Sequence, residues 1–306
     1  MRTLKEDVPE GFSKPADLPR SADQQEQWQE SNRSWWESHP MRYDFTDQLG
    51  LDEFSPEYYR EIDRRFFASV RRFMPWSKIP FDPVIDFEGL RDKNVLEIGV
   101  GCGSHAQLLA THAKSFTGID LTEYAIESTS KRLQGLNIDA SIRREDAEKL
   151  PFEDGSFDFI WSWGVIHHSS DTRTILREMA RVLRPGGRAS VMVYHRSFWI
   201  YYFAAGFIRG ILMGELFRTG SLNKTLQRWS DGAIARYYTT GEWQAEVAEF
   251  FDASSVRIFG EKVELFPLPA GRVKNFAMRL VPDAVSRFVT NNCKQGRFLF
   301  CTMEKR

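Results

Sequence analysis

A short apolar segment that runs directly into a glycine-rich turn is the feature that most constrains the fold of this chain. Residues 95–103 read VLEIGVGCG, and a second apolar segment at 116–120 ends in Gly118-Ile119-Asp120. A strand that leads into a turn of bare backbone lets a ligand approach the main chain closely. An acidic residue at the end of the next strand can bind two ribose hydroxyls. The two segments together predict a binding site for a nucleoside cofactor.

From residue 93 onward, apolar runs of four to six residues alternate with helical segments. Such alternation is typical of a parallel sheet covered on both faces. The expected helices are 104–113, 122–134, 171–183 and 240–251. The expected strands are 94–98, 116–120, 139–143, 157–162, 188–194, 255–259 and 297–303. The sequence therefore predicts an α/β fold with a doubly wound, Rossmann-like sheet of seven strands. The turn Pro185-Gly186-Gly187 is expected to separate the helix at 171–183 from the strand after it.

Changes in composition divide the chain into five parts. The first part is polar and rich in proline, and the second shows a helical rhythm at 23–38 and 56–74. The fourth part is an aromatic, apolar insertion after the fifth expected strand. We expect a flexible tail at 1–22, a helical N-terminal region at 23–90, the cofactor-binding core at 91–195, an insertion at 196–238, and the C-terminal part of the core at 239–306 with a second insertion at 261–295.

Bulk composition narrows the function classes. The 306 residues carry 41 basic and 42 acidic side chains, a net charge of −1, which gives no argument for a nucleic-acid partner. Three cysteines without a CxxC pair, and no signal-peptide pattern in the first 30 residues, favour a cytoplasmic protein. The most apolar stretch, 198–217, is interrupted by Arg209 and Glu215, so its apolar part is shorter than the ~20 residues of a membrane span. We expect no metal site, because the His167-His168 pair has no spaced carboxylate or cysteine partner.

The glycine turn alone leaves two cofactors open. Gly99, Gly101 and Gly103 form G-x-G-x-G, whereas dinucleotide-binding proteins prefer G-x-G-x-x-G. Counted from Gly101, Ala106 satisfies the relaxed form G-x-G-x-x-A, so a nicotinamide cofactor passes this test. Asp120 suits either cofactor, because both contain an adenosine ribose. The other interpretation of Asp120 is a cap on the helix that follows it.

The segment 145–168 separates the two cofactors. Asp146 and Ala147 follow an expected strand, where a carboxylate can accept a hydrogen bond from an adenine amino group. The strings VLEIGVGCG, TGIDLT, REDAEKLPFEDGSFDFIWSWGVIHH and EMARVLRPGG then occur in this order. Over residues 93–195 the chain thereby resembles class I S-adenosylmethionine-dependent methyltransferases, of the broad bacterial type that acts on small molecules. A nicotinamide-dependent dehydrogenase has no reason to carry the last two strings.

The resemblance implies cofactor contacts beyond the carboxyl ends of several strands. Around the methionine part it places Glu97, Gly99, Gly101 and Gly103. Around the adenosine it places Asp120 on the ribose, Leu121 against the adenine, and Asp146 and Ala147 at the adenine edge. Beneath the cofactor it places Ser162, Trp163 and Gly164. In many relatives an N-terminal tyrosine closes over the cofactor, and Tyr43 is the candidate; the alternative is aromatic packing.

The expected reaction is methyl transfer to a small molecule, more on oxygen than on nitrogen or carbon. Methyl transfer asks the protein to align donor and acceptor, exclude water and remove a proton. The candidate bases are His167 and His168 after the fourth strand and His195 after the fifth. The alternative for His168 is a structural role in the loop before Asp171.

The insertion at 196–238 is expected to form the lid over the acceptor. Its aromatic and aliphatic side chains favour a hydrophobic or amphipathic acceptor first, a dimer interface second, and a transient membrane-surface contact third. The basic residues along it can meet an anionic acceptor or lipid head groups, or lie on a solvated face: Arg209, Arg218, Lys224 and Arg228. Two other functions stay open, an NAD-dependent oxidoreductase and a non-catalytic protein that binds S-adenosylmethionine.

Overall fold

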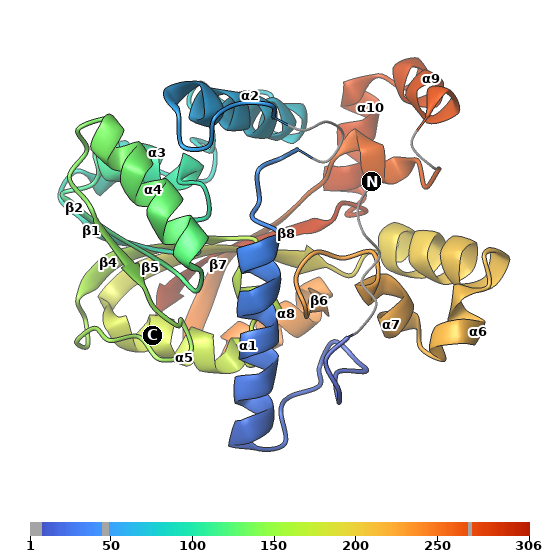
Figure 1. Cartoon of the computed structure of the whole chain (residues 1–306), viewed down its shortest axis with the longest axis horizontal. Helices are drawn as coiled ribbons and strands as arrows, with labels where there is room; N and C mark the ends of the chain where they lie inside the picture. Colours follow the sequence, from blue (N-terminus) through green and yellow to red (C-terminus); the bar gives the residue numbers. More distant parts are fainter. Residues whose placement is uncertain (1–7, 45–48, 269–270) are drawn as a thin grey trace.

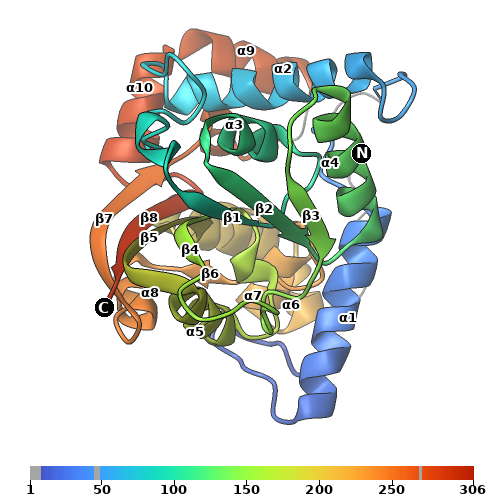
Figure 2. The same ribbon diagram turned by 90° about the vertical axis from the view of Figure 1, so that its left-hand side faces the viewer.

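A single twisted sheet forms the centre of the protein (Figures 1 and 2), which is described by a computed structural model over residues 8–44, 49–268 and 271–306. The strand order is β3-β2-β1-β4-β5-β8-β7, with β8 antiparallel to both of its neighbours and the other pairs parallel. The strands are β1 (Asn94–Ile98), β2 (Ser115–Asp120), β3 (Ser141–Arg144), β4 (Phe157–Trp163), β5 (Leu183–His195), β6 (Tyr237–Tyr238), β7 (Phe251–Phe259) and β8 (Phe298–Lys305). The predicted doubly wound α/β sheet is confirmed, and β6 is a two-residue addition that pairs with the end of β5.

Helices cover both faces of this sheet. Figure 2 shows α2, α3 and α4 on one side and α5 and α8 on the other. The helices are α2 (Pro56–Phe73), α3 (Ser104–His112), α4 (Glu123–Gly135), α5 (Thr172–Val182) and α8 (Thr240–Val247), with a 3-10 turn η1 (Glu88–Leu90) before β1. Side chains alternate between the two faces along β1, because Leu96 and Ile98 pack in the cluster under α5 and α8, whereas Val95 packs under α2 and α3.

Two strands begin earlier than the sequence predicts. β5 begins at Leu183, so the proline-glycine segment is part of the strand. Leu183 pairs with Phe157, and the register then shifts before Arg188 pairs with Phe159. Gly186 has a φ of +69°, which places the expected bend inside this irregular part of the ladder. β7 begins at Phe251, because that buried side chain pairs with the end of β8.

The N-terminal region contains α1 (Ala22–Ser38) and α2, at the two predicted positions. The Ser21 and Ser55 side chains cap these helices by accepting hydrogen bonds from backbone amides in the first turn. Residues 8–21 differ from the expected loose tail. Phe12 is 1% exposed and packs edge-on against Trp28 of α1, with ring centroids 5.6 Å apart. The Arg236 guanidinium donates to the carbonyl oxygens of residues 15 and 17. One aromatic anchor and one buried cation thus hold a segment whose composition alone predicts flexibility.

Both insertions lie over the same end of the sheet. The first contains a π-helix, η3 (Phe198–Leu212), followed by α6 (Glu215–Thr219) and α7 (Leu222–Gln227). The second contains η4 (Lys262–Leu265), α9 (Arg272–Leu280), α10 (Asp283–Arg287) and η5 (Phe288–Asn292). Because β5 and β7 are both antiparallel to β8, they run in the same direction and their carboxyl ends share one edge (Figure 1). Within the described parts of the chain, no helix has the length and apolar character needed to cross a bilayer.

Candidate active site

The glycine turn after β1 is open at one position and packed at the other two. An added Cβ at Gly101, whose φ is +53°, would have no heavy atom within 4 Å. A Cβ at Gly99 would lie 2.2 Å from Val165 Cγ2, and a Cβ at Gly103 would lie 3.0 Å from Arg132 Cδ. Gly99 and Gly103 therefore fit the turn against its neighbours, while Gly101 exposes backbone to a ligand.

Asp120 ends β2 directly beside this turn. Its Oδ2 accepts a hydrogen bond from the Gly101 amide at 3.2 Å, and its Oδ1 accepts from the Thr122 amide at 3.1 Å and from Thr122 Oγ1 at 2.9 Å. Burial raises the pKa of the carboxyl, and these hydrogen bonds oppose the shift. The cap of α4 is Thr122, whose Oγ1 accepts from the Ala125 amide. Asp120 is therefore not the helix cap that the sequence left as its alternative role.

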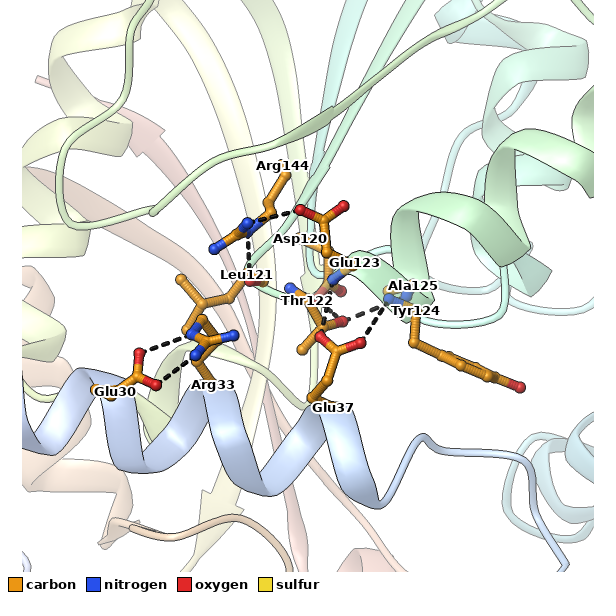
Figure 3. A network of polar contacts seen from close by, with 10 residues as sticks. All are labelled: Glu30, Arg33, Glu37, Asp120, Leu121, Thr122, Glu123, Tyr124, Ala125 and Arg144. Carbon is orange, nitrogen blue, oxygen red and sulfur yellow. Dashed lines mark hydrogen bonds and ion pairs between the residues drawn. The ribbon is translucent and has the colours of Figure 1, made fainter.

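Helix α1 lies along the loops that follow β2, β3 and β4. Figure 3 shows Glu37 of α1 at the start of α4, where its carboxylate accepts hydrogen bonds from the Glu123 and Tyr124 amides at 2.9 and 3.0 Å. Further along α1, Gln29 Nε2 donates to Asp146 Oδ1 at 2.8 Å. The Asn32 side chain donates to the backbone oxygen of His168. Sequence reasoning assigned none of these α1 contacts.

A cavity of about 1110 Å³ opens over the glycine turn and continues under the two insertions. This volume is slightly larger than the roughly 300–1,000 Å³ typical of small-ligand sites. Ten of the predicted site residues line it: Tyr43, Gly99, Gly101, Asp120, Leu121, Asp146, Ala147, Trp163, Gly164 and His168. The other five are outside its wall: Glu97, Gly103, Ser162, His167 and His195.

Glu97 and Ser162 are buried beneath the turn. Glu97 is 1% exposed, and burial raises the pKa of its carboxyl well above the ordinary range. Its Oε1 lies 3.8 Å from His105 Nδ1, and its Oε2 has no hydrogen-bond partner among the described residues. His105 lines the cavity, and burial lowers its pKa to about 3. Ser162 Oγ donates to the backbone oxygen of Ile98 at 3.1 Å, which joins β4 to β1.

The three candidate bases have different surroundings. His168 Nδ1 lies 2.6 Å from the backbone oxygen of Ile234, and the ring reaches the cavity. His167 is fully buried and its ring contacts the Tyr194 ring at a tilt, with centroids 4.1 Å apart. Burial lowers the pKa of His167 well below the ordinary value. His195 Nδ1 lies 2.9 Å from the Gly296 backbone oxygen, and burial lowers its pKa. Of the three, only His168 borders the cavity.

Tyr43 lies at the N-terminal wall of the cavity. Its φ of +56° is unusual for a residue other than glycine, and its ring stacks on Phe66 at 4.6 Å between centroids. Burial raises the pKa of its hydroxyl. Tyr43 therefore both lines the cavity and packs against an aromatic ring, so the closing role and the packing role both stay open.

The lid half of the cavity contains residues that the sequence did not single out. Its apolar wall comes from both insertions and includes Ile200, Ala205, Leu226, Val263 and Phe266. Its charged side chains are Arg209, Asp231, Glu261, Glu264, Lys274 and Arg297. Of these, only Arg209 had been noted. The directions of the strands could have predicted these residues. Insertions that follow two strands of the same direction meet over one edge of the sheet.

Comparisons with known proteins agree with this arrangement. Residues 96–191 match the family described as "Methyltransferase domain". The 27-O-demethylrifamycin SV methyltransferase of Amycolatopsis mediterranei is 38% identical over 100 residues, which are 32% of this chain and 37% of that protein. The phthiotriol/phenolphthiotriol dimycocerosates methyltransferase of Mycobacterium tuberculosis is 42% identical over 102 residues, which are 32% and 36% of the two chains. The chain thus matches little more than a third of the length of these relatives.

Structural similarity extends further along the chain. The geranyl diphosphate C-methyltransferase of Streptomyces coelicolor, solved with Mg²⁺, geranyl diphosphate and S-adenosyl-L-homocysteine, has a TM-score of 0.55. The comparison covers 94% of this chain and 100% of that chain at 14% identity, which shows a shared fold.

The residues of the cavity fit S-adenosylmethionine as cofactor. Open backbone at Gly101 and the carboxylates of Asp120 and Asp146 lie at the ends of three adjacent strands, as the adenosyl and methionine parts require. The matched domain begins inside β1 and ends inside β5, on either side of this site. Residues 96–191 therefore match a methyltransferase domain, and the sheet around them has the topology expected of the class I S-adenosylmethionine-dependent methyltransferase fold.

Proposed function

We propose that this protein methylates an oxygen atom of a small hydrophobic or amphipathic molecule. One observation carries the proposal: a single cavity joins Gly101 and Asp120 to the apolar lid residues Ile200 and Ala205. A cofactor bound over the turn and an acceptor bound under the lid would therefore share one enclosure. Such sharing allows the donor and acceptor atoms to be aligned without water between them.

The cofactor supplies a methyl group that its sulfonium already activates, so the residues of this chain need only bind, orient and deprotonate. In this proposal Gly101 and the Asp120 carboxylate hold the ribose and the methionine part, and Asp146 holds the adenine. The walls formed by Trp163 and the lid exclude water. When bound, S-adenosylmethionine would supply the methyl group, and a base of this chain would take the proton that the acceptor hydroxyl loses.

His168 is the base that we propose. With Nδ1 2.6 Å from the Ile234 carbonyl oxygen, Nδ1 carries the proton and Nε2 carries the lone pair that a base needs. His167 and His195 lie outside the cavity wall and serve as matched controls. We expect His168→Gln to lower kcat by about 100-fold or more while cofactor affinity is retained.

The test is calorimetry with S-adenosylhomocysteine, followed by an acceptor screen that measures its formation from S-adenosylmethionine. Tight binding of S-adenosylhomocysteine without binding of NAD, together with turnover of a hydrophobic or amphipathic alcohol or phenol, is the expected result. Binding of NAD instead would overturn the cofactor assignment. Cofactor binding without turnover of any acceptor would favour a non-catalytic role. Equal loss of kcat in His168→Gln and His195→Gln would remove His168 as the base.

A further inference from the structure

The lid half of the cavity brings together three basic side chains from separate segments. Arg209 comes from η3, Lys274 from α9, and Arg297 directly precedes β8. Both charged groups that act on Lys274 are cations: burial lowers its pKa first, and the charges of Arg209 and Arg297 lower it further. Cations placed close together in a partly buried wall cost free energy unless an anion joins them.

None of the three makes an ion pair with a side chain in residues 8–44, 49–268 or 271–306. Lys274 Nζ likewise has no hydrogen-bond partner in those residues, and the buried Nε of Arg297 has none either. The Arg209 guanidinium lies 3.7 Å above the Trp229 ring, and Trp229 Nε1 donates to Glu215 at 2.8 Å. Glu215 thus fixes the ring on which Arg209 rests. Stacking holds the guanidinium by its face and leaves its edge N–H groups to donate.

Carboxyl groups on the same wall do not neutralise Lys274. Burial raises the pKa of Glu264 to about 8, so this side chain is mostly uncharged at pH 7. Glu261 accepts a hydrogen bond from Ser69 of α2, and Asp231 accepts one from the Tyr194 hydroxyl at 3.4 Å. Glu264 accepts a hydrogen bond from the backbone amide of Arg297 at 3.2 Å, and neither Glu264 nor Asp231 acts on Lys274. Lys274 is therefore the cation on which no acidic group acts, whereas Arg209 has the Glu215 carboxylate as its one acidic neighbour.

We propose that Lys274 and Arg209 form an anion subsite that binds a carboxylate or phosphate group of the methyl acceptor, with Arg297 as a further donor. Guanidinium and ammonium donors bind either anion by charge-assisted hydrogen bonds. Apolar side chains of the same wall, including Ala205 and Leu226, would hold the rest of the molecule. The acceptor is therefore an anionic amphiphile, an assignment that rests on the proposed methyl transfer.

The binding test uses octyl phosphate, octanoate and octanol in calorimetry, with S-adenosylhomocysteine titrated separately into every variant. Octyl phosphate and octanoate distinguish the two anions, and octanol measures the apolar contribution alone. The variants are Lys274→Met and Arg209→Gln. Their matched controls are Lys224→Met and Arg218→Gln, which remove exposed charges of the first insertion outside the cavity wall.

We expect at least one anion to bind about tenfold or more tightly than octanol. Lys274→Met and Arg209→Gln should each weaken anion binding by about tenfold or more and leave octanol and S-adenosylhomocysteine binding nearly unchanged. The two control variants should behave as wild type. Equal binding of octanol and both anions, or anion binding that the two cavity variants do not weaken, would overturn the subsite. Selective anion binding without binding of S-adenosylhomocysteine would support the subsite and refute the proposed methyl transfer.

Discussion

Replacement of Asp120 by alanine gives a direct measure of the cofactor site. The Asp120 carboxylate lies beside the open backbone of Gly101, where its two oxygens would accept hydrogen bonds from the two ribose hydroxyls. Each hydrogen bond to a charged group contributes about 1.5–3 kcal/mol. Some of this is offset, because the carboxylate also holds the Gly101 and Thr122 amides, which the variant leaves to water. We expect a net loss of about 1–3 kcal/mol, which raises the Kd for S-adenosylhomocysteine roughly 5- to 150-fold.

Calorimetry at fixed pH measures this loss, with thermal unfolding as a check that the variant is folded. Asp120→Asn keeps one acceptor oxygen and should fall between wild type and Asp120→Ala. Asp139→Ala removes an exposed carboxylate before β3 and should not change the Kd. A folded Asp120→Ala variant that binds S-adenosylhomocysteine as tightly as wild type would refute the assigned role of this side chain.

Three further predictions concern stability. Burial raises the pKa of Glu264 from 4.5 to about 8, so the folded state binds this proton more tightly, and the free energy of unfolding falls as pH rises through that interval. Glu264→Gln should therefore gain about 1–3 kcal/mol over wild type between pH 5 and pH 9 in urea unfolding; a gain that does not grow with pH would contradict this. Glu37→Ala removes the acceptor for two amides at the start of α4 and should cost about 0.5–2 kcal/mol, whereas Glu30→Ala, which loses an ion pair within α1, should cost less than about 0.5 kcal/mol. Phe12→Ala should cost about 3–5 kcal/mol because Phe12 is 1% exposed, while Leu18→Ala at 51% exposure should be nearly neutral; equal small losses would mean that residues 8–21 are not anchored.

The core of the fold could be predicted because each element carries its own local signal. The strand at β1 reads as an apolar run before glycine, and α2 has a serine cap followed by proline at its start. Each of these signals is formed by residues that are close together in the sequence, so it can be recognised without knowledge of the fold. The placement of residues 8–21 depends on Phe12 meeting Trp28 and on Arg236 from more than 200 residues away. Such long-range contacts leave no periodic trace in a polar, proline-rich segment.

The candidate site likewise has one half that could be predicted from the sequence and one half that could not. The cofactor half lies on turns whose glycine and acidic residues have fixed spacing, so ten predicted residues meet in one cavity. The acceptor half is assembled by the two insertions, and its charged residues are scattered between Arg209 and Arg297. Their convergence depends on strand order and direction, which residue spacing does not encode. The histidines show the remaining difficulty, because His167 and His168 are adjacent in sequence but only one reaches the cavity.

The contacts of α1 have a consequence for how the loops around the cofactor site move together. One helix is joined through Glu37, Gln29 and Asn32 to the loops that follow β2, β3 and β4. Because the helix moves as one body, a displacement that breaks its hydrogen bond to one loop also strains its hydrogen bonds to the other two loops. Amide hydrogen exchange throughout α1 should therefore slow as a unit when S-adenosylhomocysteine binds, and breaking one attachment should make all three loops exchange faster together.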